Sequence, residues 1–183
     1  MYFHRMGMMG YLLLSGSILP AQGQTVTVPI LIDSTFNLYQ SGNIFLSGQP
    51  SRENLEWLSK EGVSLVINIR TAPEIEKFTA SQYDEAALVR ELNMDYLQAP
   101  VGGADGYKPE TMEKISDAIV HVKGKVLIHC TIAARATLVW MAWLIRNNYC
   151  TIDEAVKLGE KVKFSFPLEN LLGYPVHMEK AGN

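Results

Sequence analysis

The sequence predicts an α/β domain with a central, largely parallel sheet of four to five strands and helices on both faces. Two observations lead to this fold class. Short apolar segments rich in β-branched residues alternate along the chain with longer segments of helical periodicity. The clearest strand, Val63 to Ile69, is apolar almost throughout, as expected of a strand that is covered on both faces.

The remaining elements follow from local patterns. Three further strands are predicted, at residues 43–46, 96–101 and 126–129. Helices are predicted at residues 51–61, 82–92, 109–122 and 136–148, and from Thr151 onward. Pro73 is interpreted as a break between elements. The segment 136–148 is strongly apolar, which indicates a buried central helix.

Length and charge limit the class of protein. A chain of 183 residues with 48% hydrophobic content fits one domain with a sizeable core. The formal net charge is -3, and no run of Lys or Arg occurs. This pattern argues against a nucleic-acid surface or a polybasic membrane patch, and it favours small soluble ligands over DNA.

Residues 1–23 have the pattern of a secretory signal peptide. Arg5 precedes a mostly apolar stretch from Met6 to Leu19, and Ala21-Gln22-Gly23 places small residues at both cleavage positions. An uncleaved membrane anchor is the alternative, but the stretch is shorter than the roughly 20 residues that a span needs. We therefore expect a periplasmic or secreted protein without membrane contact after cleavage. Residues 24–42 are then a polar lead-in, and residues 43–183 form one domain.

Cysteine and histidine usage bears on disulfides and metals. The chain has two cysteines, Cys130 and Cys150, in different contexts, and we expect both thiols to be free. The four histidines are scattered singly, without zinc-ligand spacing. The sequence therefore predicts no metal site and no cofactor.

The chemically informative segment is a loop between a strand and a helix. Cys130 follows the apolar strand at 126–129, four residues separate it from Arg135, and a helix follows. Free backbone N–H groups and the dipole at a helix N-terminus bind an oxyanion and favour the thiolate form of a nearby cysteine. The planar guanidinium of Arg135 can hold two further oxygens of such an anion.

Two polar side chains near this loop have alternative interpretations. His129 is either a hydrogen-bonded core histidine or a residue that orients Cys130. Arg70 ends the strand at 63–69 and could line the same cleft, but pairing with Glu74 or Glu76 is the preferred explanation.

The loop from Val126 to Ala136 resembles the bacterial dual-specificity-like protein tyrosine phosphatase family, which includes the phosphatase-like domain fused to beta-lactamase-like hydrolases. The supporting segments are Leu46-Ser47-Gly48-Gln49-Pro50, Val66-Ile67-Asn68-Ile69-Arg70 and Pro100-Val101. The resemblance covers about Asn43 to Asn148 and implies a cysteine-phosphatase-like fold.

The resemblance also implies a phosphocysteine mechanism acting on a phosphoprotein or a phosphorylated small molecule. Cys130 would be the nucleophile, and Arg135 would hold the phosphoryl oxygens. Asp105 matches the general acid of the family, although Asp105-Gly106 is also an ordinary turn signal. The residues around the bound phosphoryl group would be His129, Thr131, Ile132, Ala133 and Ala134.

The loop departs from the family pattern in three ways. It has four residues between cysteine and arginine where the family usually has five, and it carries Ile132 and Ala133 where Gly and Ser are common. Ala136 replaces the usual hydroxyl residue after the arginine, and whether Thr137 reaches the thiolate is left open. We expect these departures to impair turnover more than anion binding.

Two other functions remain open from the residues alone. A loop with four residues after the cysteine also fits rhodanese-like sulfurtransferases, whose nucleophile carries a persulfide. The apolar residues Ile132 and Ala133 would also suit a catalytically weak module that binds phosphate or another oxyanion.

Overall fold

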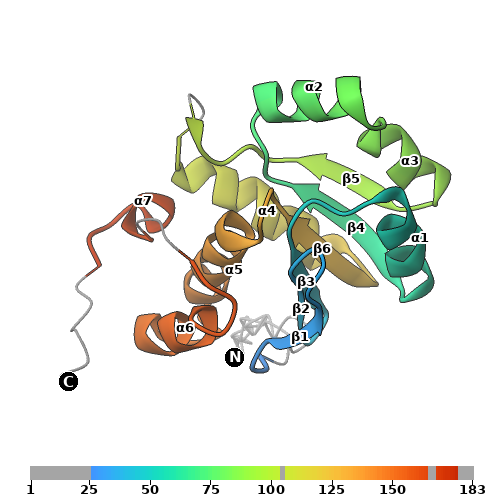
Figure 1. Ribbon diagram of the computed structural model, residues 1–183. Coiled ribbons are helices and arrows are strands. Elements are labelled where there is room, and N and C mark those ends of the chain that lie inside the picture. Colours follow the sequence, from blue (N-terminus) through green and yellow to red (C-terminus); the bar gives the residue numbers. More distant parts are fainter. Residues whose placement is uncertain (1–25, 104–105, 165–167, 177–183) are drawn as a thin grey trace, which may run out of the picture.

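The computed structural model describes residues 26–103, 106–164 and 168–176. Its sheet has six strands in the order β1-β2-β3-β6-β4-β5 (Figure 1). The strands are β1 (Ile30–Asp33), β2 (Leu38–Ser41), β3 (Ile44–Ser47), β4 (Val63–Asn68), β5 (Asp95–Gln98) and β6 (Lys125–His129). The four strands β3, β6, β4 and β5 are parallel, whereas β1, β2 and β3 are antiparallel neighbours.

Helices cover both faces of this sheet. They are α1 (Arg52–Lys60), α2 (Ala72–Ser81), α3 (Glu85–Glu91), α4 (Pro109–His121), α5 (Ala134–Arg146), α6 (Ile152–Gly159) and α7 (Glu169–Leu172). Helices α1 and α3 pack against β4 and β5 on one face, while α5 packs against β3 and β6 and carries α4, α6 and α7. The predicted α/β fold with a mainly parallel centre is confirmed, and the sheet as a whole is mixed.

The segment from residue 26 to 42 differs from its expected role as a polar lead-in. It supplies β1 and β2, which extend the sheet beyond β3 by antiparallel pairing. Three apolar residues of β1, Ile30, Leu31 and Ile32, are exposed, so this edge strand lacks the buried face by which strands are recognised in a sequence.

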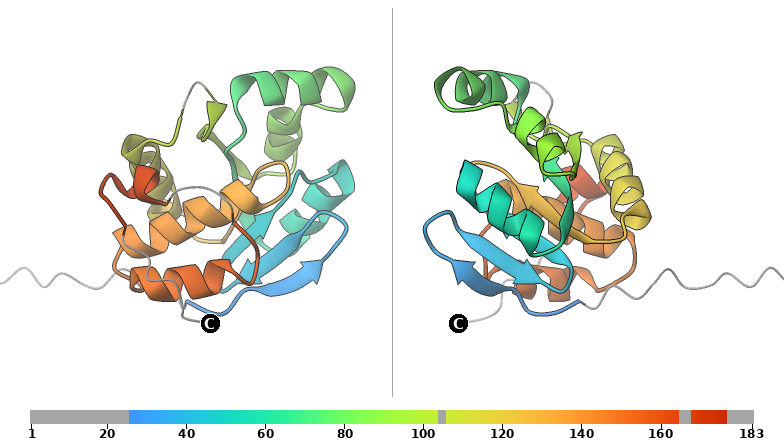
Figure 2. Two further views of the ribbon diagram at one scale, coloured as in Figure 1. Left: turned by 60° about the vertical axis from the view of Figure 1, so that its left-hand side comes forward. Right: turned by 90° about the vertical axis from the view of Figure 1, so that its right-hand side faces the viewer.

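Helix α2 is a second difference from what the sequence predicted. Pro73 was interpreted as a break between elements, and no helix was expected around it. The structure places Pro73 in the first turn of α2, where the missing N–H costs no hydrogen bond. Thr71 and Glu74 form a capping box at the start of this helix. No residue of α2 is buried, and the helix lies at the opposite end of the molecule from α6 (Figure 2).

The core lies mainly between the sheet and α5. Ten residues of α5, from Ala136 to Ile145, are buried, as the apolar pattern predicted. Trp140 and Trp143 are among the largest fully buried side chains. This packing fixes the start of α5 against the end of β6, which is where the predicted loop lies.

The predicted signal peptide, residues 1–23, lies outside the described residues. Within the described ranges, no helix is both long enough and apolar enough to cross a membrane. Cys130 and Cys150 are both free thiols, Cys130 buried and Cys150 partly exposed.

Candidate active site

Cys130 follows β6, which lies between β3 and β4 in the parallel part of the sheet. Its N–H donates to the carbonyl of Ser47 at 3.2 Å, and the carbonyl of His129 accepts from the N–H of Ile69 at 3.1 Å. These bonds to both neighbouring strands hold the cysteine backbone in place at the carboxyl edge of the sheet. The residue is only 1% exposed, so its environment is set by the protein rather than by bulk water.

The loop after Cys130 is held by the chain that follows β3. The N–H of Gln49 donates to the carbonyl of Thr131 at 3.2 Å, and Gly48 forms an isolated antiparallel bridge with Ile132. Ala133 then turns the chain into α5 with φ 73°, in the left-handed region. The loop is therefore a turn held by backbone contacts, and it leads directly into the N-terminus of a long buried helix.

Several amides of this loop are available to a ligand. In the part of the chain that the structure describes, the N–H groups of Thr131, Ile132, Ala134 and Arg135 donate no hydrogen bond. They lie at or just before the N-terminus of α5, where the helix dipole favours a negative charge. This arrangement supports the predicted oxyanion site.

The guanidinium of Arg135 is held in a fixed position. Nη1 donates to Glu74 Oε2 at 3.0 Å and to the carbonyl of Val101 at 2.9 Å, and Nη2 donates to Glu74 Oε1 at 2.5 Å. The hydroxyl of Thr131 also donates to Glu74 Oε1, at 3.2 Å. Among the described residues, Nε–H of Arg135 has no acceptor, so it remains available to a bound anion.

Glu74 and Arg135 each favour the charged form of the other. Burial opposes ionisation of Glu74, but the hydrogen bonds from Arg135 and Thr71 lower its pKa to about 2. Burial also disfavours a charged Arg135, yet its hydrogen bond to Glu74 and the nearby charge of Cys130 raise its pKa. Arg135 therefore stays charged, and it lies close enough to Cys130 to interact with it electrostatically.

Arg70 does not make the predicted ion pair. Its Nη2 donates to the backbone carbonyl of Glu74 at 2.8 Å, and its Nη1 donates to Gln49 Oε1 at 2.5 Å. The guanidinium also lies 5.2 Å from the centre of the Phe78 ring. The expected pairing of Arg70 with the carboxylate of Glu74 or Glu76 is therefore wrong, because Arg135 takes the carboxylate of Glu74.

His129 is a buried histidine with a carboxylate partner. Its Nε2 lies 2.6 Å from Oε1 of Glu85, and the two side chains are 0% and 3% exposed. Glu85 Oε2 also accepts from Gln49 Nε2 at 2.8 Å and from Asn68 Nδ2 at 3.3 Å. Burial would raise the pKa of Glu85, but the charge and hydrogen bond of His129 bring it below its ordinary value.

Asp105, the predicted general acid, lies outside the described residues. The chain on either side of it is closed by two hydrogen bonds between Gly102 and Gly106, at 3.0 and 3.2 Å. Val101, just before this closure, accepts the hydrogen bond from Arg135. The segment that leads to Asp105 is thus hydrogen-bonded to Arg135.

Thr137 and Tyr107 complete the surroundings of the loop. The hydroxyl of Thr137 is fully buried and donates to the carbonyl of Ala133 at 3.0 Å, so it supports the turn. Burial raises the pKa of Tyr107, and the charges of Arg135 and Cys130 act on it in opposite directions. Tyr107 therefore lies near both predicted catalytic residues and stays neutral at ordinary pH.

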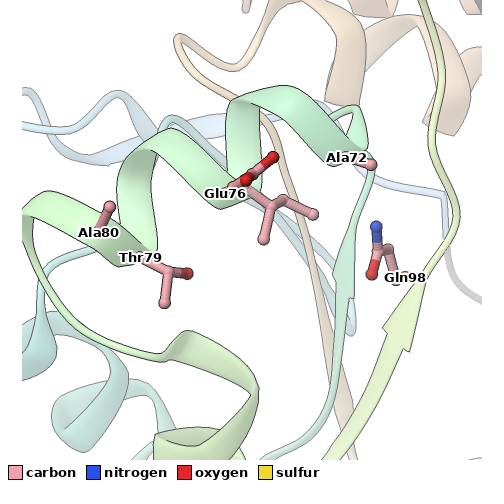
Figure 3. A pocket seen from close by; sticks show the side chains of 6 residues that line it. Ala72, Glu76, Thr79, Ala80 and Gln98 are labelled. Atoms are coloured by element: carbon pink, nitrogen blue, oxygen red, sulfur yellow. The ribbon is translucent and has the colours of Figure 1, made fainter.

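A separate pocket lies beside α2 (Figure 3). It is lined by Ala72, Ile75, Glu76, Thr79, Ala80 and Gln98. Neither Cys130 nor Arg135 is among these residues, so this pocket is not part of the site built around the loop.

Sequence reasoning missed Glu74 and Glu85 as members of this site. Thr71 and Glu74 have the spacing of a capping box, and that signal could have revealed both the helix and its carboxylate. For Glu85 the sequence holds no comparable signal, because its partner His129 is brought to it only by the fold.

The comparisons with known proteins bear on the fold and on the class of protein that the chain is similar to. No family model matches the chain. Human dual specificity protein phosphatase 9 is 24% identical over 160 residues, which cover 84% of this chain and 38% of the human protein. The match thus spans well under half of that curated relative.

Solved structures of phosphatases are similar to this chain in fold. A kinase associated phosphatase with a substituted catalytic-site cysteine has a TM-score of 0.55 at 18% identity, covering 65% of this chain and 74% of its own. The chain has the fold of the cysteine-dependent phosphatases. TpbA of P. aeruginosa in complex with pTyr has a TM-score of 0.58 at 16% identity, covering 75% of this chain and 80% of its own. These likenesses show the fold that the resemblance to the bacterial dual-specificity-like phosphatases implied.

Proposed function

We propose that this protein is a cysteine-dependent phosphatase that hydrolyses phosphomonoesters through a phosphocysteine intermediate. One observation carries the proposal: Cys130 and Arg135 flank a short loop whose free amides lie at the N-terminus of α5. Phosphoryl transfer needs mainly positioning and stabilisation of charge, and this loop supplies both. The human phosphatase relative and the phosphatase fold support the same reaction.

In this mechanism the thiolate of Cys130 attacks phosphorus, and the sulfur–phosphorus bond forms as the ester oxygen leaves. Arg135 and the amides of residues 131–134 hold the three non-bridging oxygens. Asp105 gives its proton to the leaving oxygen. Water then attacks the phosphocysteine, Asp105 takes a proton from it, and the sulfur leaves as thiolate while inorganic phosphate is released.

The substrate is proposed to be a phosphoprotein or a phosphorylated small molecule. TpbA, which shares the fold, was solved with pTyr, and this favours an aryl phosphate. Nucleic acid is not expected as a partner, nor is a membrane surface after signal cleavage, because the chain carries a net charge of -3 and no basic run.

Phosphate release from p-nitrophenyl phosphate tests the proposal directly. The wild-type protein should turn over this aryl phosphate and be inhibited by vanadate, whereas Cys130→Ser should be inactive but still bind phosphate. Cys150→Ser is the matched control and should keep full activity, because Cys150 lies beyond the C-terminal end of α5, away from the loop. Cyanide-dependent sulfur transfer from thiosulfate without phosphate release would instead support the rhodanese-like function.

The role of Asp105 has its own test. Asp105→Asn should lower kcat for phenyl phosphate, whose leaving group needs a proton, by about 100-fold. The loss for p-nitrophenyl phosphate should be smaller, because its phenolate leaves more readily. Asp95→Asn, at an exposed position of β5, is the control for a change of charge alone. Equal losses for the two substrates would remove Asp105 from the acid role.

We further propose that residues 1–23 are a signal peptide and that the mature enzyme is periplasmic or secreted. The apolar stretch from Met6 to Leu19 and the small residues Ala21 and Gly23 support this location. N-terminal sequencing of the protein from a periplasmic or culture fraction should begin at Gln24. Recovery of the full chain, with Met1 or Tyr2 first, from the cytoplasm would contradict it.

A further inference from the structure

Arg70 is a buried arginine whose hydrogen bonds go to neutral acceptors. It is 8% exposed, and among the described residues it forms no direct ion pair. Its Nε is also buried without an acceptor in the part of the chain that the structure describes. Burying a guanidinium costs free energy, and a carboxylate in direct contact is the usual compensation. An apolar side chain would fill this position at lower cost, so the partners of Arg70 point to its role.

The guanidinium of Arg70 joins two separate segments of the chain. Nη1 donates to Gln49 Oε1 at 2.5 Å, and Nη2 donates to the carbonyl of Glu74 at 2.8 Å. The guanidinium carbon lies over the ring of Phe78, 5.2 Å from its centre. Gln49 belongs to the chain after β3, whereas Glu74 and Phe78 belong to α2. Arg70 thus fixes the first turns of α2 relative to the chain that follows β3.

Both of these segments contact the loop at the start of α5. The N–H of Gln49 donates to the carbonyl of Thr131 at 3.2 Å. On the other side, Glu74 accepts from both Nη atoms of Arg135 and from the hydroxyl of Thr131. A closed circuit of contacts therefore runs from Arg70 through Gln49 to the loop, and back to Arg70 through Glu74.

Helix α2 depends on such contacts for its position, because none of its residues is buried. A helix without a buried stripe gains little orientation from the core. The ring of Phe78 packs against Tyr83, with ring centres 5.1 Å apart, and this contact supports the later half of the helix. The first turn is held by the polar contacts of Arg70 and Glu74. A shift of this turn moves the carboxylate that orients Arg135, and misplacing such a group by about 1 Å costs on the order of 100-fold in rate.

We propose that Arg70 is a positioning residue of the phosphatase reaction, which places the first turn of α2 so that the carboxylate of Glu74 orients Arg135 for the phosphoryl group. The inference rests on the proposed function. Arg70 is anchored at Gln49 and acts through Glu74, and not on the reacting atoms. The role requires a forked side chain, because the two acceptors take different nitrogens. A lysine keeps the charge but offers one ammonium in place of the fork.

The test is a double-mutant cycle between Arg70 and Glu74, measured as kcat/KM for p-nitrophenyl phosphate. Arg70→Met and Glu74→Gln should each lower this ratio by about tenfold, the loss expected when Arg135 is no longer oriented. The double variant should also lose about tenfold, because the two changes remove one and the same effect. Losses that multiply to about 100-fold would overturn the proposal.

Arg70→Lys separates geometry from charge, and it guards against misfolding because it retains a long cationic side chain. It should lose nearly as much kcat/KM as Arg70→Met, whereas recovery to the wild-type value would show that the charge alone matters and would overturn the proposal. Arg52→Met is the matched control and should keep the wild-type value, because Arg52 is an exposed arginine of α1 that lies over the ring of Tyr83. Circular dichroism gives the Tm of each variant, and all assays are run well below it.

A binding measurement separates this inference from the phosphatase reaction. In the Cys130→Ser background, calorimetric titration with inorganic phosphate should show a Kd about fivefold higher with Arg70→Met, and no higher when Glu74→Gln is added. A wild-type protein that binds phosphate but releases none from p-nitrophenyl phosphate would contradict the phosphatase reaction alone, and the same cycle in Kd would still decide whether Arg70 acts through Glu74. A wild-type protein that binds no phosphate would overturn both.

Discussion

Glu74 binds both Nη atoms of Arg135 through its two carboxylate oxygens, although the two residues lie on different helices. The contact joins the first turn of α2 to the first turn of α5. A guanidinium held in this way is oriented before an anion arrives, so less entropy is lost on binding. The position of α2 therefore matters for the site, even though α2 buries none of its residues.

Loss of this contact should impair catalysis. Glu74→Gln removes the charged partner of Arg135, and we expect kcat/KM for p-nitrophenyl phosphate to fall by about tenfold, equivalent to about 1.4 kcal/mol of transition-state stabilisation. Glu76→Gln is the matched control, since it removes a carboxylate from an exposed position of the same helix. Equal kinetics for the two variants would show that Arg135 is oriented without Glu74.

The same ion pair makes stability depend on pH. The pKa of Glu74 falls from 4.5 to about 2 on folding, so the pair stabilises the fold fully above pH 4.5. That contribution is lost as the pH falls from 4.5 towards 2. Because Glu74 is partly exposed and screened by solvent, we expect about 1 to 2 kcal/mol. Urea unfolding should show wild type more stable than Glu74→Gln by this amount at pH 6, and the difference should shrink steadily below pH 4.

Ala133 adopts a backbone conformation that side chains disfavour. Its φ of 73° costs an L-residue about 1 to 2 kcal/mol, which glycine avoids. Ala133→Gly should therefore be neutral or stabilising by up to about 1 kcal/mol, after the loss of one buried methyl group. Ala134→Gly, at the first residue of α5, should instead destabilise by about 0.5 to 1 kcal/mol. Denaturant unfolding of both variants checks this, and similar losses would contradict it.

Gly48 leaves no room for a side chain. A Cβ at this position would lie 2.8 Å from the carbonyl oxygen of Phe36 and 3.0 Å from that of Thr131. Gly48→Ala should displace the loop, costing about 1 to 3 kcal/mol of stability and lowering kcat/KM together. Gly62→Ala is strained by its φ of +88° but lies in open space, so it should reduce stability while leaving kinetics unchanged. A fully active Gly48→Ala enzyme would argue against a rigid loop.

The parts of the fold with strong local signals were predicted correctly. Val63 to Ile69 and the strand ending at His129 were recognised because they are buried on both faces. Helix α5 was recognised because nearly every side chain is apolar and buried. The loop between Cys130 and Arg135 could be predicted from the strand ending at His129 and from α5, since its chemistry depends on a strand before it and a helix after it.

The missed parts have weaker or purely tertiary signals. Strands β1 and β2 are short, and β1 is mostly exposed, so no alternating pattern marks it. Helix α2 has a cap but no buried stripe, and its Pro73 reads equally well as a break. Glu74 and Glu85 contact partners far along the chain, and only the folded arrangement brings such pairs together.

The hydrogen bond from the N–H of Gly48 to the carbonyl of Phe36, at 2.8 Å, has a practical consequence for recombinant work. A fragment trimmed to begin at residue 43 would lose the hairpin that supplies this acceptor, and with it a contact that holds Gly48 beside the loop from Cys130 to Arg135. Expression clones should therefore start upstream of β1, and a shortened protein that is soluble but inactive would not count against the chemistry.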